Sequence, residues 1–128
     1  MTTPVTEQDP EWPELARFQQ QLKQFIAERD WDQFQSPKNL SMALAGEVGE
    51  LLEHFQWLSE DQSRNLSPDQ LEAVAMEMAD IQIYLANLAE RLCIALGPAV
   101  ARKMEINAQK YPVDQARGRA TKYNRLED

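Results

Sequence analysis

The sequence predicts an all-α protein, and three observations support this prediction. The chain of 128 residues contains only four glycines, and the helix-favouring residues Leu, Ala, Glu and Gln are abundant. Apolar residues recur at three- and four-residue spacing over four segments, as they do in amphipathic helices. Proline lies near the expected start of each segment, where a helix tolerates it. The length predicts a single domain over residues 1–128.

The first helix is expected to begin near Pro13 and to end at about Arg29. Its apolar stripe consists of Leu15, Phe18, Leu22, Phe25 and Ile26. Residues 1–11 are polar and contain proline, so we expect them to be irregular. Residues 30–37 are expected to form a connecting loop that carries Trp31.

The second and third helices are each preceded by a capping signal. Ser36-Pro37 precedes a helix expected over residues 38–58, with the stripe Leu44, Val48, Leu51 and Phe55. Residues 59–67 are expected to be a polar loop. Ser67-Pro68-Asp69-Gln70 then fits a capping box, and the third helix carries Val74, Met78, Ile81, Leu85, Leu88 and Leu92.

The fourth helix is expected to follow Gly97-Pro98, which should also stop the third helix. Its shared face consists of Val100, Met104, Asn107 and Tyr111, and Pro112 should end it. The tail over residues 113–128 is expected to be irregular. Four such helices predict a four-helix bundle in which the second and third helices run antiparallel.

Charge and composition restrict the partners and the compartment. A net charge of −8 argues against binding to a nucleic-acid polymer, which needs a basic surface. Seven of the thirteen basic residues lie between Arg102 and Arg125, a distribution that suits a small polyphosphate ligand or, alternatively, a solvated basic tail. Without an apolar run of ~20 residues or a signal-like N-terminus, the chain is expected to be cytoplasmic with no membrane partner.

The single cysteine, Cys93, falls among the apolar residues of the third helix. It is therefore expected to be a buried packing thiol, since a nucleophilic cysteine usually needs a histidine partner and His54 is the only histidine. Five methionines and three tryptophans in so short a chain leave apolar surface to cover. We therefore expect self-association.

Two matched pairs of acids lie beside the apolar stripes of the second and third helices. Glu47 and Glu50 are three residues apart, as are Glu77 and Asp80. At roughly 100° per residue, both pairs flank their stripes at similar angles, so in an antiparallel pair of helices the four carboxylates can converge. Oxygen ligands without cysteine or paired histidine select Mg²⁺, with Mn²⁺ as the alternative. By angle alone, a solvated acidic surface remains the commoner explanation.

The two motifs together resemble those of a known family. GEVGE from Gly46 and EMAD from Glu77 closely resemble the Glu-x-x-Glu and Glu-x-x-Asp motifs of the MazG-like, all-α nucleoside triphosphate pyrophosphatases. The stretches ERDWDQFQSPKNLSMALAGEVGELLEHFQW, DIQIYL, KMEINAQKYP and ARGRATKY are most similar to the dCTP pyrophosphatase branch of this family.

The resemblance implies the fold, the reaction and the site. It implies Mg²⁺-dependent hydrolysis of dCTP, or a modified dCTP, to the monophosphate and pyrophosphate. A carboxylate should accept the proton of the attacking water, and we expect Glu50 to do so. The resemblance also implies a homotetramer, with a dimer as the alternative, in which more than one chain builds each site. The implied metal ligands are Glu47, Glu50, Glu77 and Asp80, and the implied substrate contacts are Trp31, Trp57, Tyr84, Lys103, Asn107, Lys110 and Tyr111.

One departure and two alternatives bear on the substrate. Leu22 stands where the mammalian dCTP enzyme has a histidine near the base, so a hydrogen bond to the base is lost here. The same fold could act on another nucleotide such as dUTP. A different class, a non-catalytic helical interaction protein, would use the acids for solubility alone.

Overall fold

The computed structural model describes residues 12–126 of the chain as parts of two compact units. One unit covers residues 12–94, and the other contains residues 95–126. The predicted irregularity of residues 1–11 lies outside the described residues, and the assignment of all 128 residues to one domain stays a prediction.

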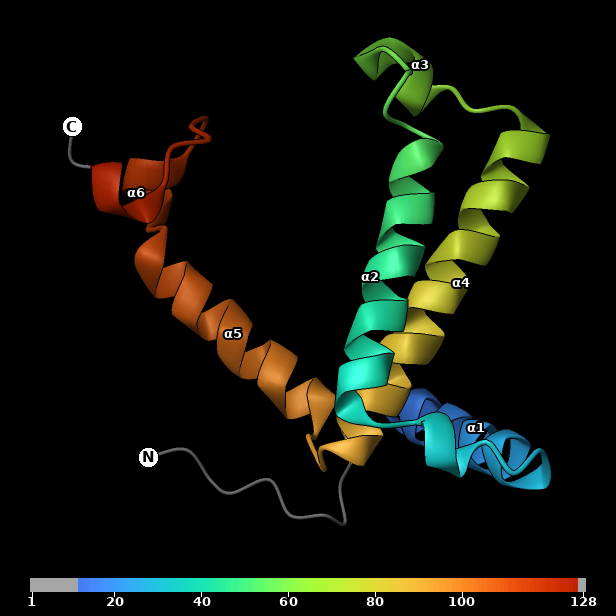
Figure 1. Ribbon diagram of the computed structural model, residues 1–128. Coiled ribbons are helices and arrows are strands. Elements are labelled where there is room, and N and C mark those ends of the chain that lie inside the picture. The colour runs from blue at the N-terminus through green and yellow to red at the C-terminus, as the bar shows by residue number, and fades with distance from the viewer. Residues whose placement is uncertain (1–11, 127–128) are drawn as a thin grey trace. The chain divides into compact units, whose positions relative to one another are not determined.

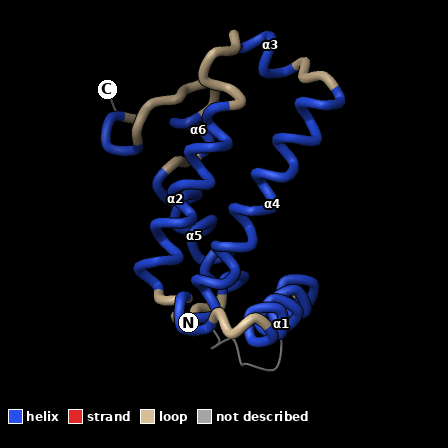
Figure 2. The backbone as a smooth tube through the Cα atoms, turned by 45° about the vertical axis from the view of Figure 1, so that its right-hand side comes forward, coloured by secondary structure: helices blue, strands red, loops and turns tan. Residues whose placement is uncertain are grey.

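The first unit is built on three long helices. They are α1 (Pro13–Glu28), α2 (Pro37–Glu53) and α4 (Pro68–Arg91). Helices α2 and α4 lie side by side and run in opposite directions, and α1 packs on α4 (Figures 1 and 2). The side chains buried between these helices include Ile26, Leu40, Val74, Ala86, Asn87 and Ala89. The all-α prediction is confirmed for residues 12–126, which contain no strand.

Helix α2 begins as predicted and ends five residues earlier than predicted. The Ser36 hydroxyl accepts a hydrogen bond from the Asn39 amide, and Pro37 is the first helical residue. At the other end the amide of His54 bonds the carbonyl of Leu51, three residues back. This tightening closes the helix, so the predicted end at Leu58 is wrong.

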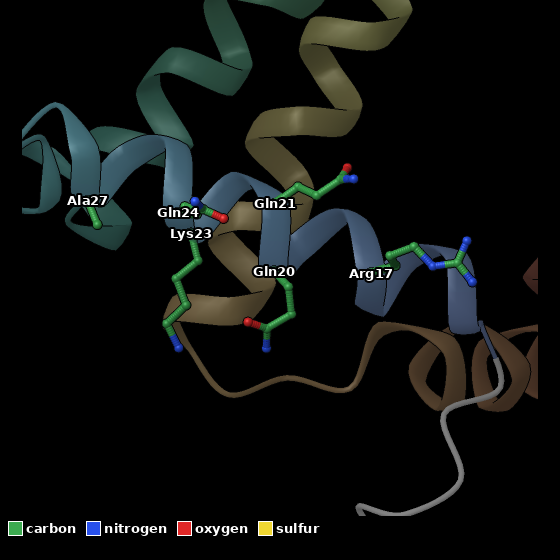
Figure 3. Close-up of a pocket in the computed structure, with 6 residues that line it drawn as sticks. All are labelled: Arg17, Gln20, Gln21, Lys23, Gln24 and Ala27. Carbon is green, nitrogen blue, oxygen red and sulfur yellow. The ribbon is translucent and has the colours of Figure 1, made fainter.

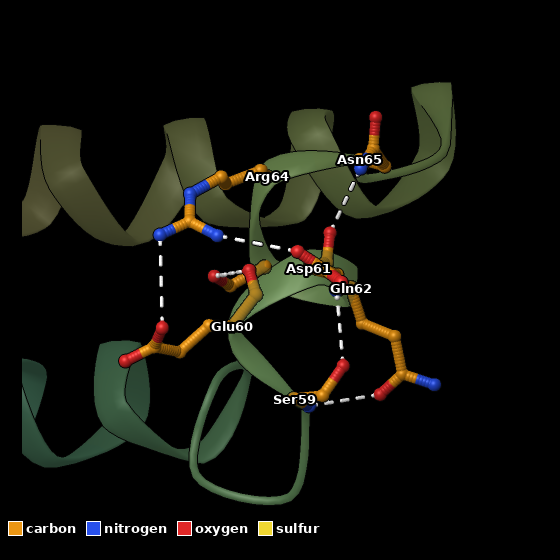
Figure 4. Close-up of polar contacts among 7 residues, drawn as sticks. Ser59, Glu60, Asp61, Gln62, Arg64 and Asn65 are labelled. Carbon is orange, nitrogen blue, oxygen red and sulfur yellow. Dashed lines mark hydrogen bonds and ion pairs between the residues drawn. The ribbon is translucent and has the colours of Figure 1, made fainter.

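The segment predicted as a polar loop after α2 contains a short helix, α3 (Glu60–Arg64). Ser59 and Gln62 form a complete capping box, in which each side chain bonds the other's backbone amide (Figure 4). The Arg64 guanidinium also contacts Glu60 and Asp61. The sequence Ser-Glu-Asp-Gln carried this signal, although the lack of apolar residues concealed the helix.

Helix α4 starts with the predicted capping box and stops before the predicted boundary. Ser67 and Gln70 cap it, but its last residue is Arg91, well before Gly97. Cys93 follows with a φ of 54° in the left-handed region, a conformation that ends helices. Cys93 is exposed, so the prediction of a buried packing thiol is wrong: the helix ends before this residue can face the core.

The second unit consists of α5 (Leu96–Lys110), α6 (Val113–Ala116) and the 3-10 helix η2 (Tyr123–Arg125). Pro112 lies between α5 and α6, so the prediction that Pro112 ends the fourth helix is confirmed. The tail is more ordered than predicted, because Tyr123 packs edge-on against Tyr111, with ring centroids 6.3 Å apart. The Lys110 ammonium lies 4.7 Å from the centre of the Tyr123 ring. The completion of a four-helix bundle by α5 stays a prediction.

Large apolar side chains remain exposed on the described chain. Several of them belong to the apolar faces predicted for the four helices, namely Phe25, Val48, Met78, Leu92, Val100, Met104 and Tyr111. Others on α2 and α4 are Met42, Leu52, Leu71 and Met76. No single helix among residues 12–126 has the length and apolar content to cross a membrane.

Candidate metal centre

The predicted acids of α2 and α4 lie together where the two helices face each other. Glu47, Glu77 and Asp80 each offer a carboxylate oxygen, and these three oxygens lie within 4.8 Å of one another. Glu47 and Glu77 are half-buried, whereas Asp80 is exposed. Because α2 and α4 run antiparallel, an acid pair on each helix reaches the same place from opposite directions.

The charges of this cluster act most strongly on Glu47. Burial raises the pKa of Glu47 from its ordinary value of 4.5 to about 7, and the neighbouring carboxyls of Glu50, Asp80 and Glu77 add to the rise. Glu50 therefore lies close enough to interact directly with Glu47. Carboxylates held this near one another repel, and either a proton or a cation relieves the repulsion.

Two oxygens of the cluster indicate that a cation fits it. Glu47 Oε2 and Glu77 Oε2 are buried, and neither has a hydrogen-bond partner among the described residues. Buried polar atoms are normally paired. A donor set made only of carboxylate oxygens suits a hard divalent cation. The cluster of acids thus has the oxygen ligands that such an ion prefers, and two of these oxygens have no other partner among the described residues.

His54 adjoins the cluster from the end of α2. Its Nε2 lies 3.6 Å from Glu77 Oε1. The structure thus places the chain's single histidine beside the acids.

We expect the raised pKa of Glu47 to make stability without metal depend on pH. Between pH 4.5 and about 7 the folded protein holds a proton on Glu47 that the unfolded chain has released. The free energy of unfolding should therefore fall as pH rises through this window. Melting temperatures in EDTA at pH 5 and pH 7.5 should show this fall.

Two comparisons test the origin of that pH dependence. Glu47→Gln, which cannot titrate, should show a smaller fall than the unsubstituted protein, and millimolar Mg²⁺ should reduce the fall by replacing the proton. If the Gln variant and the unsubstituted protein have the same pH profile, the raised pKa of Glu47 is wrong.

The two tryptophans predicted to enclose the base are both accessible. Trp31 is 45% exposed and Trp57 is 85% exposed. Trp31 precedes α2 and Trp57 follows it, and a helix of 17 residues is about 25 Å long. The two indoles of one chain therefore lie near opposite ends of α2, too far apart to enclose one base between them.

The remaining predicted substrate residues are divided between the two units. Tyr84 lies on α4 and is half-buried, one helical turn beyond Asp80. Three of the others lie on α5 and the fourth immediately follows it, at spacings that give them one face of that helix: Lys103, Asn107, Lys110 and Tyr111. Asn107 and Lys110 are half-buried.

Two surface features lie apart from the acids. A shallow pocket lies along the surface of α1, and all of its lining residues come from that helix (Figure 3). A second cavity, of about 290 Å³, lies between α1, the 3-10 helix η1 (Asp32–Phe34) and α4, and Leu22, Asn87 and Arg91 help to line it. Neither Asn87 nor Arg91 was predicted from the sequence. The available signal was an asparagine among the apolar residues Leu85, Ala86, Leu88 and Ala89, because an amide in apolar surroundings needs a partner.

Known proteins are similar to this chain in both sequence and fold. The model of the MazG-like family matches residues 38–126, a segment that contains all four acids. The chain belongs to the MazG-like family. Among curated proteins, mouse dCTP pyrophosphatase 1 is 45% identical over 116 residues, covering 89% of this chain and 68% of the mouse protein. The human dCTP pyrophosphatase 1 is 43% identical with the same coverage.

A solved structure extends the comparison of this MazG-like chain to three dimensions. A pyrophosphatase from Archaeoglobus fulgidus superposes with a TM-score of 0.74 at 37% identity, covering 80% of this chain and 95% of the archaeal chain. The family assignment from the acid motifs is thereby confirmed.

Proposed function

We propose that this MazG-like protein is a nucleotide pyrophosphohydrolase that converts dCTP to dCMP and pyrophosphate with Mg²⁺. The observation that carries the proposal is the group of acids on α2 and α4, in which two buried carboxylate oxygens lack a partner among the described residues. The identity of 43–45% to dCTP pyrophosphatases supports the substrate and the reaction.

The carboxylates of Glu47, Glu50, Glu77 and Asp80 would hold the cation. When bound, Mg²⁺ neutralises phosphate oxygens and makes water a better nucleophile at neutral pH. Glu50, which is exposed at the edge of the cluster, accepts the proton from the attacking water. The new bond forms between the water oxygen and the α-phosphorus, and the bond from the α-phosphorus to the bridging oxygen breaks.

The leaving group is pyrophosphate, which takes the electron pair of the broken bond. Lys103 and Lys110 compensate its growing negative charge. Asn107, Tyr111 and Tyr84 contact the sugar and phosphates, and Trp31 and Trp57 stack on the base. Stacking recognises any base, so the choice of cytosine needs further contacts, and Leu22 supplies no hydrogen bond.

A panel of nucleotides tests both the reaction and the base. Purified protein with millimolar Mg²⁺ should release pyrophosphate, not orthophosphate, from dCTP, 5-methyl-dCTP, dUTP and the other triphosphates, with the highest kcat/KM for a cytosine nucleotide. A preference for dUTP would change the substrate within the same function. If neither turnover nor a rise in melting temperature with Mg²⁺ and any triphosphate is observed, the non-catalytic alternative is correct.

The positions of the tryptophans support a site made by more than one chain. Because Trp31 and Trp57 of one chain lie near opposite ends of α2, a base that touches both takes them from two chains. The exposed apolar side chains of α2 and α4, such as Val48, Leu52 and Met76, would be buried by that association. A homotetramer accounts for both features, and a dimer is the smallest assembly that does.

The mass in solution is therefore expected to be several times the 14.7 kDa of one chain. Light scattering coupled to size exclusion at micromolar concentration measures it. Leu52→Glu, which places a charge on the exposed face of α2, should lower the mass and the activity together. A monomeric mass for the unsubstituted protein would contradict the shared site.

A further inference from the structure

The turn that follows Trp31 is attached to α4 at both of its ends. This turn is the 3-10 helix η1. At its start, an Arg91 Nη2 donor lies 2.6 Å from Asp32 Oδ1. Just after its end, Asn87 Nδ2 donates to Gln35 Oε1 at 2.7 Å. We refer to these two contacts, made by residues one helical turn apart on α4, as the clamp.

The two α4 residues of the clamp are themselves held in place. Asn87 is 5% exposed, so its amide is fixed among packed groups. Arg91 Nε also lies 3.5 Å from Asn87 Oδ1, which links the two. On the facing side, Gln19 of α1 donates to the Ala86 carbonyl at 3.0 Å. The clamp thus fastens the turn to the most buried part of α4.

The backbone and ring of Trp31 are fixed from the α1 side. The Trp31 amide bonds the carbonyl of buried Ile26 at 3.1 Å. Asp30 adopts a φ of 53°, the left-handed conformation that aspartate tolerates better than most residues other than glycine, and it turns the chain out of α1 directly before Trp31. The rings of Trp31 and Phe25 pack in a T-shaped arrangement, with centroids 5.9 Å apart, and the Arg29 guanidinium lies over the Phe25 ring.

We propose that Arg91 and Asn87 are positioning residues, which hold the turn through Asp32 and Gln35 so that the half-exposed Trp31 ring is in place before the base arrives. The inference rests on the proposed stacking of Trp31 on the base. A ring that is already ordered loses less conformational entropy on binding, and Trp31 meets the base in ground and transition states alike. The clamp therefore acts on KM and leaves kcat nearly unchanged.

Loss of the clamp should disturb the turn more than the fold. Arg91 is 27% exposed and Asp32 is 59% exposed, and ion pairs this accessible add little to overall stability. Arg91→Ala is the main test, and Asp32→Asn is a milder one that removes the charge from the exposed partner. The matched control is Glu90→Ala, which breaks the neighbouring 3.6 Å ion pair between α4 and Lys23 of α1 without touching the turn.

The kinetic experiment compares these variants with and without Trp31. Arg91→Ala and Asp32→Asn should each raise the KM for dCTP about three- to tenfold, with kcat within about twofold. The double variant Arg91→Ala/Asp32→Asn should have the same KM as Arg91→Ala alone, because both changes remove the same ion pair. In a Trp31→Ala background neither change should raise KM further, and Glu90→Ala should resemble the unsubstituted protein.

A second measurement reads the clamp without substrate. In a protein that carries Trp12→Phe and Trp57→Phe, Trp31 is the only tryptophan. Adding Arg91→Ala to this protein should increase the quenching of Trp31 fluorescence by acrylamide roughly 1.5-fold. Unchanged quenching and KM would overturn the inference, as would a KM increase that persists in the Trp31→Ala background. If Trp31→Ala alone leaves KM unchanged, the proposed base contact fails, and the inference fails with it. The two failures are thus distinguishable.

Discussion

Replacing Glu50 by Gln is expected to reduce pyrophosphate release from dCTP by about a hundredfold or more, without loss of stability in EDTA. The substitution keeps the size of the side chain and removes one charge from a group in which the neighbouring carboxyls help to raise the pKa of Glu47 to about 7. Less repulsion means that the metal-free protein should melt at the same or a higher temperature. The cation would be held wrongly and the water would lose its proton acceptor. Asp80→Asn should act in the same direction.

The matched control for Glu50→Gln is Glu53→Gln. Glu53 is exposed on the same helix, three residues further along, and its replacement should change neither activity nor stability by more than the small effect of a surface charge. Melting temperature in EDTA and turnover in millimolar Mg²⁺ are measured on the same preparations. Near-normal turnover by both Glu50→Gln and Asp80→Asn would remove the acids from the mechanism.

Replacing Trp57 by Ala is expected to raise the KM for dCTP about tenfold or more. Stacking of an aromatic side chain on a base is worth roughly 1–3 kcal/mol in single-strand nucleic-acid binders, and 1.4 kcal/mol corresponds to about a factor of ten. Trp57 is 85% exposed, so the fold of the single chain has little need of its ring.

The control for Trp57→Ala keeps an aromatic surface at the same position. Trp57→Phe should retain most of the affinity, because a smaller ring still stacks. Steady-state kinetics of both variants are read together with their mass in solution, which shows whether assembly is intact. An unchanged KM for a correctly assembled Trp57→Ala protein would mean that this tryptophan does not meet the base.

Capping residues and prolines predicted the starts of α1, α2 and α4, whereas the C-terminal ends of α2 and α4 were predicted too late. Pro13, the Ser36 cap and the capping box of Ser67 each begin a helix as predicted, because caps and prolines act within a few residues. Helix α4 ends at Arg91 because the backbone turns left-handed at Cys93. That turn has no glycine to announce it, and the apolar pattern continued through it.

The sequence by itself predicted the family and the reaction class through the resemblance of its motifs, and it singled out the four acids because spaced acid pairs on amphipathic helices are a local pattern. Tertiary structure decided how these parts meet. The antiparallel contact of α2 and α4 brings Glu47, Glu77 and Asp80 within reach of one ion, and burial in that contact raises the pKa of Glu47. The attachment of the Trp31 turn to Asn87 and Arg91 joins residues more than fifty positions apart. Helical periodicity describes one helix at a time, and such contacts depend on how separate helices pack.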